Sequence, residues 1–275
     1  MDMSTEIPGQ VYLCQVSETI SCGACCGLYN IPHLSRPHLE SLLQDRTARF
    51  RFIPRTEDDL DDFALQELRC LGDDRPYPHF HHCPFLGLIG AHQSRVGCLL
   101  HPLIPENKGL DLRGYSYYGA AACRLYFCPV SYRLPARYKL VVQTTAPNWY
   151  IYGLLITEHR LLQALFADLE NRLGRKITAN DFQTGTSAAQ HIQPLLELKE
   201  TWPYRSARSP GPCHYVFEDG EYMRPGTRYP RMLTGTSRFS TILDELDSAF
   251  DSERSMRRAE AELESLLASV AAALA

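Results

Sequence analysis

The placement of cysteine is the feature that most restricts what this chain can fold into. The heptapeptide SCGACCG, residues 21–27, holds three cysteines, two of them adjacent, with glycines between and after them. Nine of the ten cysteines lie in the first 128 residues of the 275-residue chain. Cysteines that only fill a hydrophobic core are scattered, whereas clustered cysteines bind metal, form disulfides or carry out redox chemistry. We therefore expect the N-terminal part of the chain to be organised by its thiols.

The length and the first residues of the chain argue against a disulfide framework. Such frameworks are typical of short secreted domains. The first ten residues, MDMSTEIPGQ, contain neither the basic nor the apolar segment of a secretory signal. The longest apolar stretch, WYIYGLLI, is far shorter than the roughly 20 residues that span a bilayer. We therefore expect a cytoplasmic protein with reduced thiols and no membrane partner.

The composition is that of a globular protein without a basic surface. Hydrophobic residues make up 44% of the chain and charged residues 22%, and the formal net charge is −4. Binding to nucleic acid or to an anionic membrane surface depends on clustered positive charge. The composition therefore predicts no nucleic-acid partner, and it leaves a protein substrate or partner open.

The clustered cysteines form two groups along the sequence. The first group has the spacing C-x7-C-x2-C-C, and the second has the spacing C-x14-C-x24-C-x4-C. The eight candidate metal ligands are Cys14, Cys22, Cys25, Cys26, Cys83, Cys98, Cys123 and Cys128. Two cysteines separated by two residues can turn toward one ion, and nearby glycines let the backbone approach it. Cys70 and Cys213 stand outside both groups and are not expected to bind metal.

The segments around the second group predict a hairpin and a short helix. HHCPFLGLIG and SRVGCLLHP are apolar runs separated by a polar turn, which is typical of two paired strands carrying Cys83 and Cys98. YYGAAACRLYFCPV predicts a short helix that ends at Cys128, because Pro129 follows it. Between the two groups, helices are expected over residues 35–50 and 56–71, the second ending before Gly72.

The remainder of the chain predicts further helices. A long helix is expected over residues 147–174 and a helical tail over residues 240–275. The segment 201–231 is rich in Pro, Gly, Arg and Tyr and predicts an extended loop with one strand at 214–217. Two copies of Thr-Gly-Thr-Ser, at 184–187 and 234–237, are interpreted as helix caps. The expected fold is mainly α with a small β-hairpin: an irregular cysteine-rich region, 1–135, packed on a helical region, 136–275, or one continuous unit.

Four sequence blocks, SCGACCG, CPFL, GCLLHP and CRLYFCP, occur in that order. Together they resemble the signature of the YkgJ-type cysteine-cluster family, the zinc- or iron-chelating CxxCxxCC proteins. The resemblance covers residues 14–129 and implies that Cys22, Cys25, Cys26, Cys83, Cys98 and Cys123 bind metal. The family includes a flagellin lysine N-methylase, which the resemblance associates with an iron–sulfur cluster.

The chain departs from that signature at two places. Seven residues separate Cys14 from Cys22, where the family has a much shorter interval. The resemblance therefore supports Cys14 as a ligand less than it supports the other cysteines. The third block continues as LLHPLIPENKG, where the family has an aromatic residue followed by Arg-Pro. Whatever that Arg-Pro positions in the family is absent or displaced here.

The sequence as a whole predicts a metal-binding protein with a cysteine-ligated centre, preferably a 4Fe–4S iron–sulfur cluster, with zinc as the alternative. Eight cysteines exceed the four that one metal needs, so spare thiols, two zinc ions, or one cluster with nearby non-ligating cysteines all fit. The chain has no G-x-G-x-x-G, P-loop, G-x-S-x-G or H-E-x-x-H motif, and no catalytic residue is assigned. A lysine methylase-like or redox enzyme and a structural zinc module that binds a protein both remain open. His79, His81 and His82 are expected at the surface or as donors to a ligand sulfur.

Overall fold

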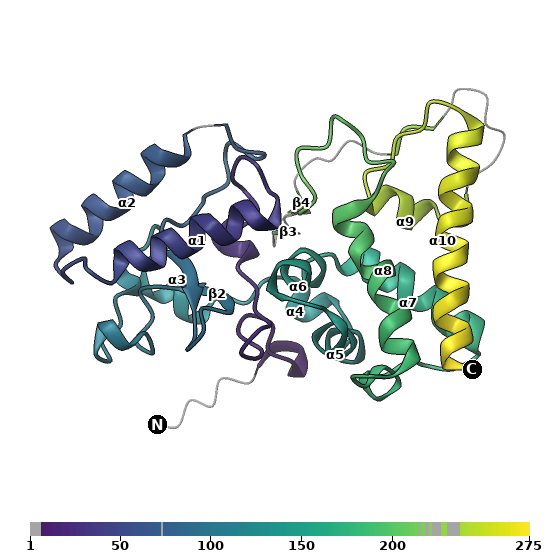
Figure 1. The fold of residues 1–275 in the computed structure, drawn as a ribbon, viewed down its shortest axis with the longest axis horizontal. Helices are drawn as coiled ribbons and strands as arrows, with labels where there is room; N and C mark the ends of the chain where they lie inside the picture. Colours follow the sequence, from purple (N-terminus) through teal and green to yellow (C-terminus); the bar gives the residue numbers. More distant parts are fainter. Residues whose placement is uncertain (1–6, 73, 215, 218–219, 222–226, 230–236) are drawn as a thin grey trace. The chain divides into compact units, whose positions relative to one another are not determined.

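The computed structural model describes residues 7–72, 74–214, 216–217, 220–221, 227–229 and 237–275 (Figure 1). The fold is mainly helical with a small antiparallel sheet of two strands, as the sequence predicts. The chain divides into two compact units. One, the cysteine unit, is Cys14–Cys128, and the other, the helical unit, joins Met1–Leu13 to Pro129–Ala275. The boundary at residue 128 lies close to the expected one, but the first thirteen residues belong with the second half of the chain.

The cysteine unit is built from short elements around an aromatic core. In chain order these are η2 (Ala24–Cys26), α1 (Arg36–Phe50), α2 (Glu57–Leu71), β1 (Leu86–Ile89), β2 (Arg95–Cys98), η3 (Pro105–Asn107), η4 (Arg113–Tyr115) and α3 (Gly119–Leu125). The strands β1 and β2 pair antiparallel, with Leu86 opposite Cys98, so the predicted hairpin is confirmed. Helix α1 packs on β1. The Phe50, Phe63 and Phe85 rings meet between them at centroid distances of 5.3–6.1 Å.

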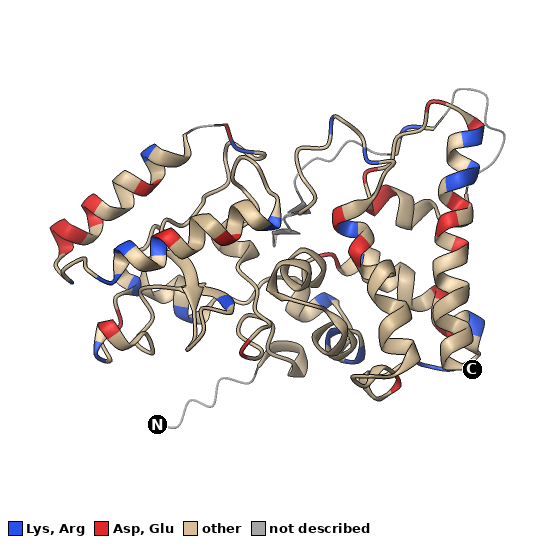
Figure 2. Cartoon of the chain, viewed as in Figure 1, with Lys and Arg blue, Asp and Glu red and all other residues tan. Residues whose placement is uncertain are grey.

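Helix α2 has the beginning and the end that the sequence predicts. The Thr56 side chain accepts a hydrogen bond from the Asp59 amide, and acidic residues fill the first turn, which Figure 2 shows in red. Negative charge there stabilises the helix, because the first amides of a helix carry partial positive charge. Gly72 ends the helix with a φ of +69°. Helix α3 ends at Leu125, three residues before the predicted end at Cys128.

The helical unit contains the longer helices. Its elements are η1 (Pro8–Gln10), α4 (Val130–Arg133), α5 (Ala136–Thr145), α6 (Trp149–Ile156), α7 (His159–Leu173), η5 (Ala179–Phe182), α8 (Ser187–Thr201), β3 (Val216–Phe217), β4 (Gly220–Glu221), α9 (Ser240–Glu245) and α10 (Glu253–Leu274). Helix α10 packs along α7 and α8 (Figure 1). Its apolar stripe, which includes Leu263, Leu267 and Val270, is buried. No helix in the described part of the chain is long and apolar enough to cross a bilayer.

Two predicted helices of this unit are interrupted, and the expectation of one continuous helix over 147–174 is wrong. Glu158 separates α6 from α7 with a non-helical ψ of 62°, and the predicted tail breaks after Glu245, where Asp247 has a φ of +54°. Each break turns a carboxylate into the same buried cluster, described below. Apolar spacing does not reveal these breaks, because the residues on either side keep the helical pattern.

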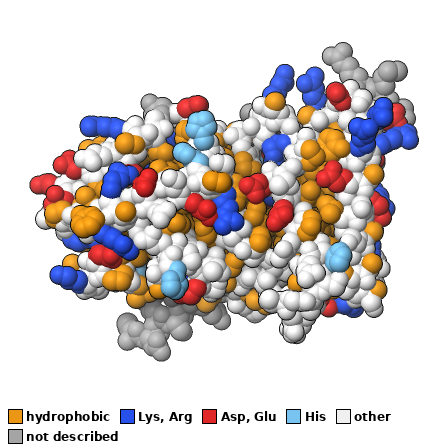
Figure 3. Space-filling model, in the orientation of Figure 1, with side chains coloured by type: hydrophobic (Ala, Val, Ile, Leu, Met, Phe, Trp, Pro, Cys, Tyr) orange, Lys and Arg blue, Asp and Glu red, His pale blue; other side chains and the backbone are white. Residues whose placement is uncertain are grey.

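The smaller predictions for this unit have mixed outcomes. Thr186 in the first Thr-Gly-Thr-Ser copy caps α8 by accepting a hydrogen bond from the Ala189 amide at 3.2 Å, as predicted. Most of the second copy lies outside the described residues. The predicted strand at 214–217 is reduced to β3, which pairs with β4. On the face drawn in Figure 3, charged and apolar side chains are interspersed.

Candidate metal centre

All eight candidate cysteines lie in the cysteine unit, and each is a free thiol. Cys83 is buried, and the other seven are half-buried. The sequence set two cysteines aside: Cys70 is exposed on α2 of the same unit, and Cys213 is buried in the helical unit. One folded unit therefore holds every predicted ligand.

Backbone hydrogen bonds bring the ligand segments side by side. The Cys22 amide donates to the Cys14 carbonyl, and the Cys83 amide donates to the Cys26 carbonyl, each at 2.8 Å. Gly27, with a φ of +80°, makes the second contact feasible, because a Cβ there would lie 2.1 Å from the His81 carbonyl oxygen. The glycine after the cysteine pair thus lets the first cysteine group lie against the second.

At three of the cysteines, the amide two residues further along the chain favours the thiolate form of the sulfur. The Ala24 amide donates to the Cys22 sulfur at 3.5 Å. The Phe85 and Leu100 amides lower the pKa of Cys83 and Cys98 in the same way, although burial outweighs them. Amide groups directed at sulfur stabilise thiolate charge, and turns of this kind are common at iron–sulfur sites. The repeated geometry indicates that these turns are shaped for anionic sulfur.

The eight thiols fall into two sets, and within each set the thiolate charges raise the pKa of their neighbours. Burial raises the pKa of Cys22 well above its usual value, and the charges of Cys25, Cys14 and Cys128 raise it further. We call these four cysteines the first set.

The second set is Cys26, Cys83, Cys98 and Cys123. Burial raises the pKa of Cys83 to about 12 and that of Cys98 to about 11, and their neighbours in the set add to both shifts. A hydrogen bond between Cys25 and Cys26 raises the pKa of Cys26 and lowers that of Cys25. Cys25 of the first set and Cys26 of the second are adjacent in the chain, so one peptide bond links the two sets.

Among the described residues, no three cysteine sulfurs are gathered as closely as the ligands of a single ion. Four thiolates on one zinc ion, with Zn–S near 2.3 Å, lie about 3.8 Å from one another. No three cysteine sulfurs in the described residues lie within 4.8 Å of one another. The ligands of a four-iron cluster each bind a different iron and so stand farther apart than the ligands of one ion.

Arg113 supplies positive charge next to the second set. The charges of Cys98 and Cys123 are among those that raise the pKa of Arg113, after its hydrogen bond to Asp111. The Asp111 carboxylate accepts from Arg113 at 2.7 and 2.8 Å and also pairs with Arg124 at 2.7 Å. The Ser116 hydroxyl lies 3.0 Å from the Cys123 sulfur. No sequence motif singles out these residues, and the only signal for them is their closeness to CRLYFCP.

The histidines before Cys83 do not behave alike. His82 is buried and contacts the Gly27 carbonyl through Nδ1 and Arg46 through Nε2, each at 2.8 Å. Burial and then Arg46 hold its pKa well below the usual value, so the neutral ring donates from Nδ1 and accepts at Nε2. His82 therefore contacts a backbone oxygen and not a sulfur, while His79 is exposed. His81 stacks on Tyr117.

A second group of buried ionisable side chains lies in the helical unit. The His214 ring contacts Glu158 at 3.0 Å through Nδ1 and Asp247 at 2.8 Å through Nε2. The Lys199 ammonium lies 3.2 Å from Glu158 and donates to the Glu245 carbonyl at 2.9 Å. All five residues are at most 3% exposed.

One ligand atom each from Glu158, His214 and Glu245 lies within 4.8 Å of the others. The ammonium of Lys199 lies beside these atoms and provides the positive charge that a metal ion would provide. Arg160 pairs with Glu245 at 3.1 Å and an Arg205 nitrogen lies 3.7 Å from Asp247. Each of the three carboxylates therefore has a cationic partner, and the cluster is a buried ion-pair network. Sequence patterns gave no signal for it, because its members come from four separate segments.

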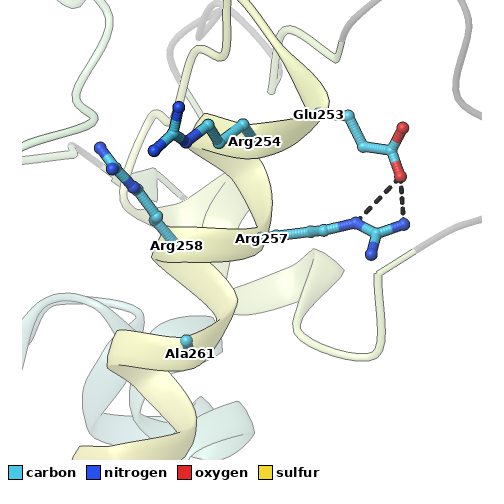
Figure 4. Close-up of a pocket in the computed structure, with 5 residues that line it drawn as sticks. All are labelled: Glu253, Arg254, Arg257, Arg258 and Ala261. Atoms are coloured by element: carbon cyan, nitrogen blue, oxygen red, sulfur yellow. Dashed lines mark hydrogen bonds and ion pairs between the residues drawn. The ribbon is translucent and has the colours of Figure 1, made fainter.

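A shallow hollow on α10 carries three arginines (Figure 4). Arg257 pairs with Glu253 at 2.9 Å, while Arg254 and Arg258 point away from that pair. Ala261 is the small residue at its edge. The hollow is open to solvent, and its charges are those of an ordinary solvated helix face.

Comparison of the chain with protein-family models, with curated proteins and with solved structures found no match. The chemistry of the cysteine unit is therefore the basis for a functional proposal.

Proposed function

We propose that this chain is a metal-binding protein whose cysteine unit holds an iron–sulfur cluster, preferably of the 4Fe–4S type. The observation that carries the proposal is the recurrence of one arrangement: the amide of the second residue after the cysteine donates to the Cys22 sulfur and lowers the pKa of Cys83 and of Cys98. A core of inert thiols has no need of this arrangement. The resemblance of the four cysteine blocks to zinc- and iron-chelating proteins agrees with it.

Electrostatics also support a bound cation. Burial raises the pKa of Cys22, Cys83 and Cys98, so without metal these side chains are neutral thiols. Metal binding requires thiolates and releases their protons. The amide donors and the nearby Arg113 offset part of the cost of that charge. This combination suits a site that is loaded with metal in a reducing compartment, and we place the protein in the cytoplasm on that ground.

The spacing of the sulfurs favours a cluster over single ions. Three ligands of one zinc ion lie closer together than any three of the described cysteine sulfurs do. The second candidate is nevertheless zinc, because the thiols divide into two sets of four, which is the ligand number of a structural zinc ion. A zinc protein of this kind would serve as a structural module for a protein partner. A redox or lysine methylase-like activity requires catalytic groups that we do not assign.

The deciding experiment is anaerobic purification followed by metal and sulfide analysis and visible spectroscopy. An iron–sulfur protein is brown, contains acid-labile sulfide and is bleached by dithionite, whereas a zinc protein is colourless. Cys70→Ser is the matched control, because Cys70 is exposed and belongs to neither set. The cluster proposal is overturned if reconstituted wild-type protein binds neither iron nor sulfide. Two zinc ions per chain would establish the second candidate.

A further inference from the structure

Three aromatic rings pack against one another beside the second set of cysteines. His81 stacks on Tyr117 with centroids 4.1 Å apart and an interplanar angle of 14°. Tyr118 meets both rings edge-on, at 5.3 Å from His81 and 5.2 Å from Tyr117. Each ring therefore touches the other two, and such contacts stabilise a fixed arrangement.

The chain places this ring cluster next to the predicted ligands on two sides. His81 precedes Cys83 by two residues, and its carbonyl lies directly against Gly27, the residue after Cys26. Tyr117 and Tyr118 immediately precede α3, which carries Cys123. The cluster thus joins three ligand segments that are far apart in sequence.

The exposed fractions of the two tyrosine side chains differ, as in an aromatic cluster with an inner and an outer ring. Tyr117 is 74% exposed and Tyr118 is 41% exposed. Tyr118 packs edge-on against His81, whose carbonyl lies against Gly27 and which precedes Cys83 by two residues. Tyr118, the less exposed tyrosine, is therefore the inner ring, and Tyr117 is the outer ring.

We propose that His81, Tyr117 and Tyr118 form a ring cap that closes the Cys25–Cys26–Cys83 side of the metal centre and slows extraction of its metal. This inference rests on the proposed function, because the cap protects a centre that the cysteines hold. Tyr118 acts by excluding water from the thiolates, and Tyr117 and His81 act by holding the Tyr118 ring in place. The chemical species that the cap excludes are small water-soluble chelators and oxidants.

The rings and not the hydroxyl groups produce this effect, which distinguishes a cap from a polar contact. Replacing Tyr117 by Phe keeps the stack on His81, whereas replacing it by Ala removes the stack. Neighbours that hold metal ligands in place typically change metal affinity about 10–100-fold when mutated. We therefore expect removal of a ring to accelerate metal release by at least about tenfold, which is the lower end of that range.

The test measures the rate at which metal leaves fully loaded protein after addition of a strong chelator under anaerobic conditions. The variants are Tyr117→Ala, Tyr118→Ala and Tyr117→Phe, and Tyr132→Ala serves as the control, because Tyr132 is an exposed tyrosine of the helical unit. Metal content before the chelator is added, together with circular dichroism, shows whether each variant folds and loads. Tyr117 is largely exposed, so its variants test the cap even where Tyr118→Ala does not fold.

The possible outcomes distinguish failure of the ring-cap proposal from failure of the metal-centre proposal. Faster release from the two Ala variants, with Tyr117→Phe and Tyr132→Ala like wild type, supports the cap. Equal release rates in all loaded variants overturn the cap and leave the metal centre intact. A wild-type protein that binds no metal after reconstitution overturns the proposed function and the cap with it.

Discussion

The two units of this chain bury charge in opposite ways. The helical unit buries acids and bases together: Lys199 pairs with Glu158, Arg160 pairs with Glu245, and Arg205 lies near Asp247. The cysteine unit gathers eight thiols, and the positive charges near them are few: Arg113 lies beside the second set, and Arg46 lowers the pKa of Cys83 slightly. One unit pairs its own buried charges, whereas the thiols of the other would, under the proposed function, be ionised by a bound cation. The difference predicts which unit depends on metal.

Of the tests proposed, removal of the metal should show the largest difference in stability between the two units. Apparent binding free energies of structural zinc in small domains are about 10 kcal/mol or more, which exceeds the stability of most domains. Stripping the metal under reducing conditions should therefore expose sites within Cys14–Cys128 to protease first, while α7, α8 and α10 persist. Limited proteolysis with mass spectrometry of the loaded and stripped forms measures this. Identical cleavage patterns in both forms would mean that the metal has no structural role.

Single cysteine substitutions sharpen the comparison within the cysteine unit. If the two sets bind separately, Cys14→Ser should lower the metal content by roughly half, and Cys98→Ser should remove the other half, because serine is a poor ligand for soft metals. If one centre is shared, either substitution should remove most of the metal. Metal analysis per folded chain distinguishes the two results. Cys70→Ser should match wild type, and a loss of metal in that variant would contradict the ligand assignment.

Within the helical unit, the ion-pair network should be costly to break. Lys199→Met removes the ammonium and leaves Glu158 buried with one partner fewer, and breaking a buried pair typically costs about 3–5 kcal/mol. Chemical denaturation followed by circular dichroism measures the loss. Lys176→Met is the matched control, because Lys176 is exposed. A loss below about 1 kcal/mol, the range of exposed pairs, would show that the network contributes little.

The same network predicts a dependence on acid. His214 and Lys199 lower the pKa of Glu158 from 4.5 to about 2, against the opposing effect of burial. A carboxyl group whose pKa is lower in the folded state stabilises the fold above its unfolded pKa and loses that contribution as the pH falls. Stability of metal-stripped protein should therefore decrease between about pH 4.5 and pH 2. In Glu158→Gln the decrease should be smaller, and an unchanged acid transition would assign the effect to other carboxylates.

The parts of this structure that the sequence predicted are those with local causes. The Thr56 cap and Gly72 fix α2, and the apolar runs on either side of a polar turn fix the hairpin. Cysteine spacing marked eight of the nine thiols that the cysteine unit holds and set Cys70 apart. The division of these thiols into two sets depends on chain folding over about a hundred residues, and spacing does not encode it.

The parts that the sequence did not predict have distant causes. Helix α6 ends and α7 begins at Glu158 because its carboxylate binds Lys199 and His214, which lie 41 and 56 positions further along the chain. Asp247 interrupts the predicted tail for the same kind of reason. The helical periodicity of apolar residues predicts which face of each segment is buried. It does not predict that a charged side chain within the segment is buried as well. The breaks therefore become visible only when all partners are placed.

The buried network of the helical unit also bears on how that unit folds. Glu158, Lys199, His214 and Asp247 come from four separate stretches of chain, and none of the four side chains has its full set of partners until the last stretch is in place. An intermediate that has assembled only some of these stretches must either leave the charged groups hydrated, and so leave that part of the core open, or bury a charge without its counterion. Both alternatives are unfavourable, so intermediates should be sparsely populated. The network thus favours a single cooperative folding transition of the helical unit, with the apolar helices providing most of the driving force.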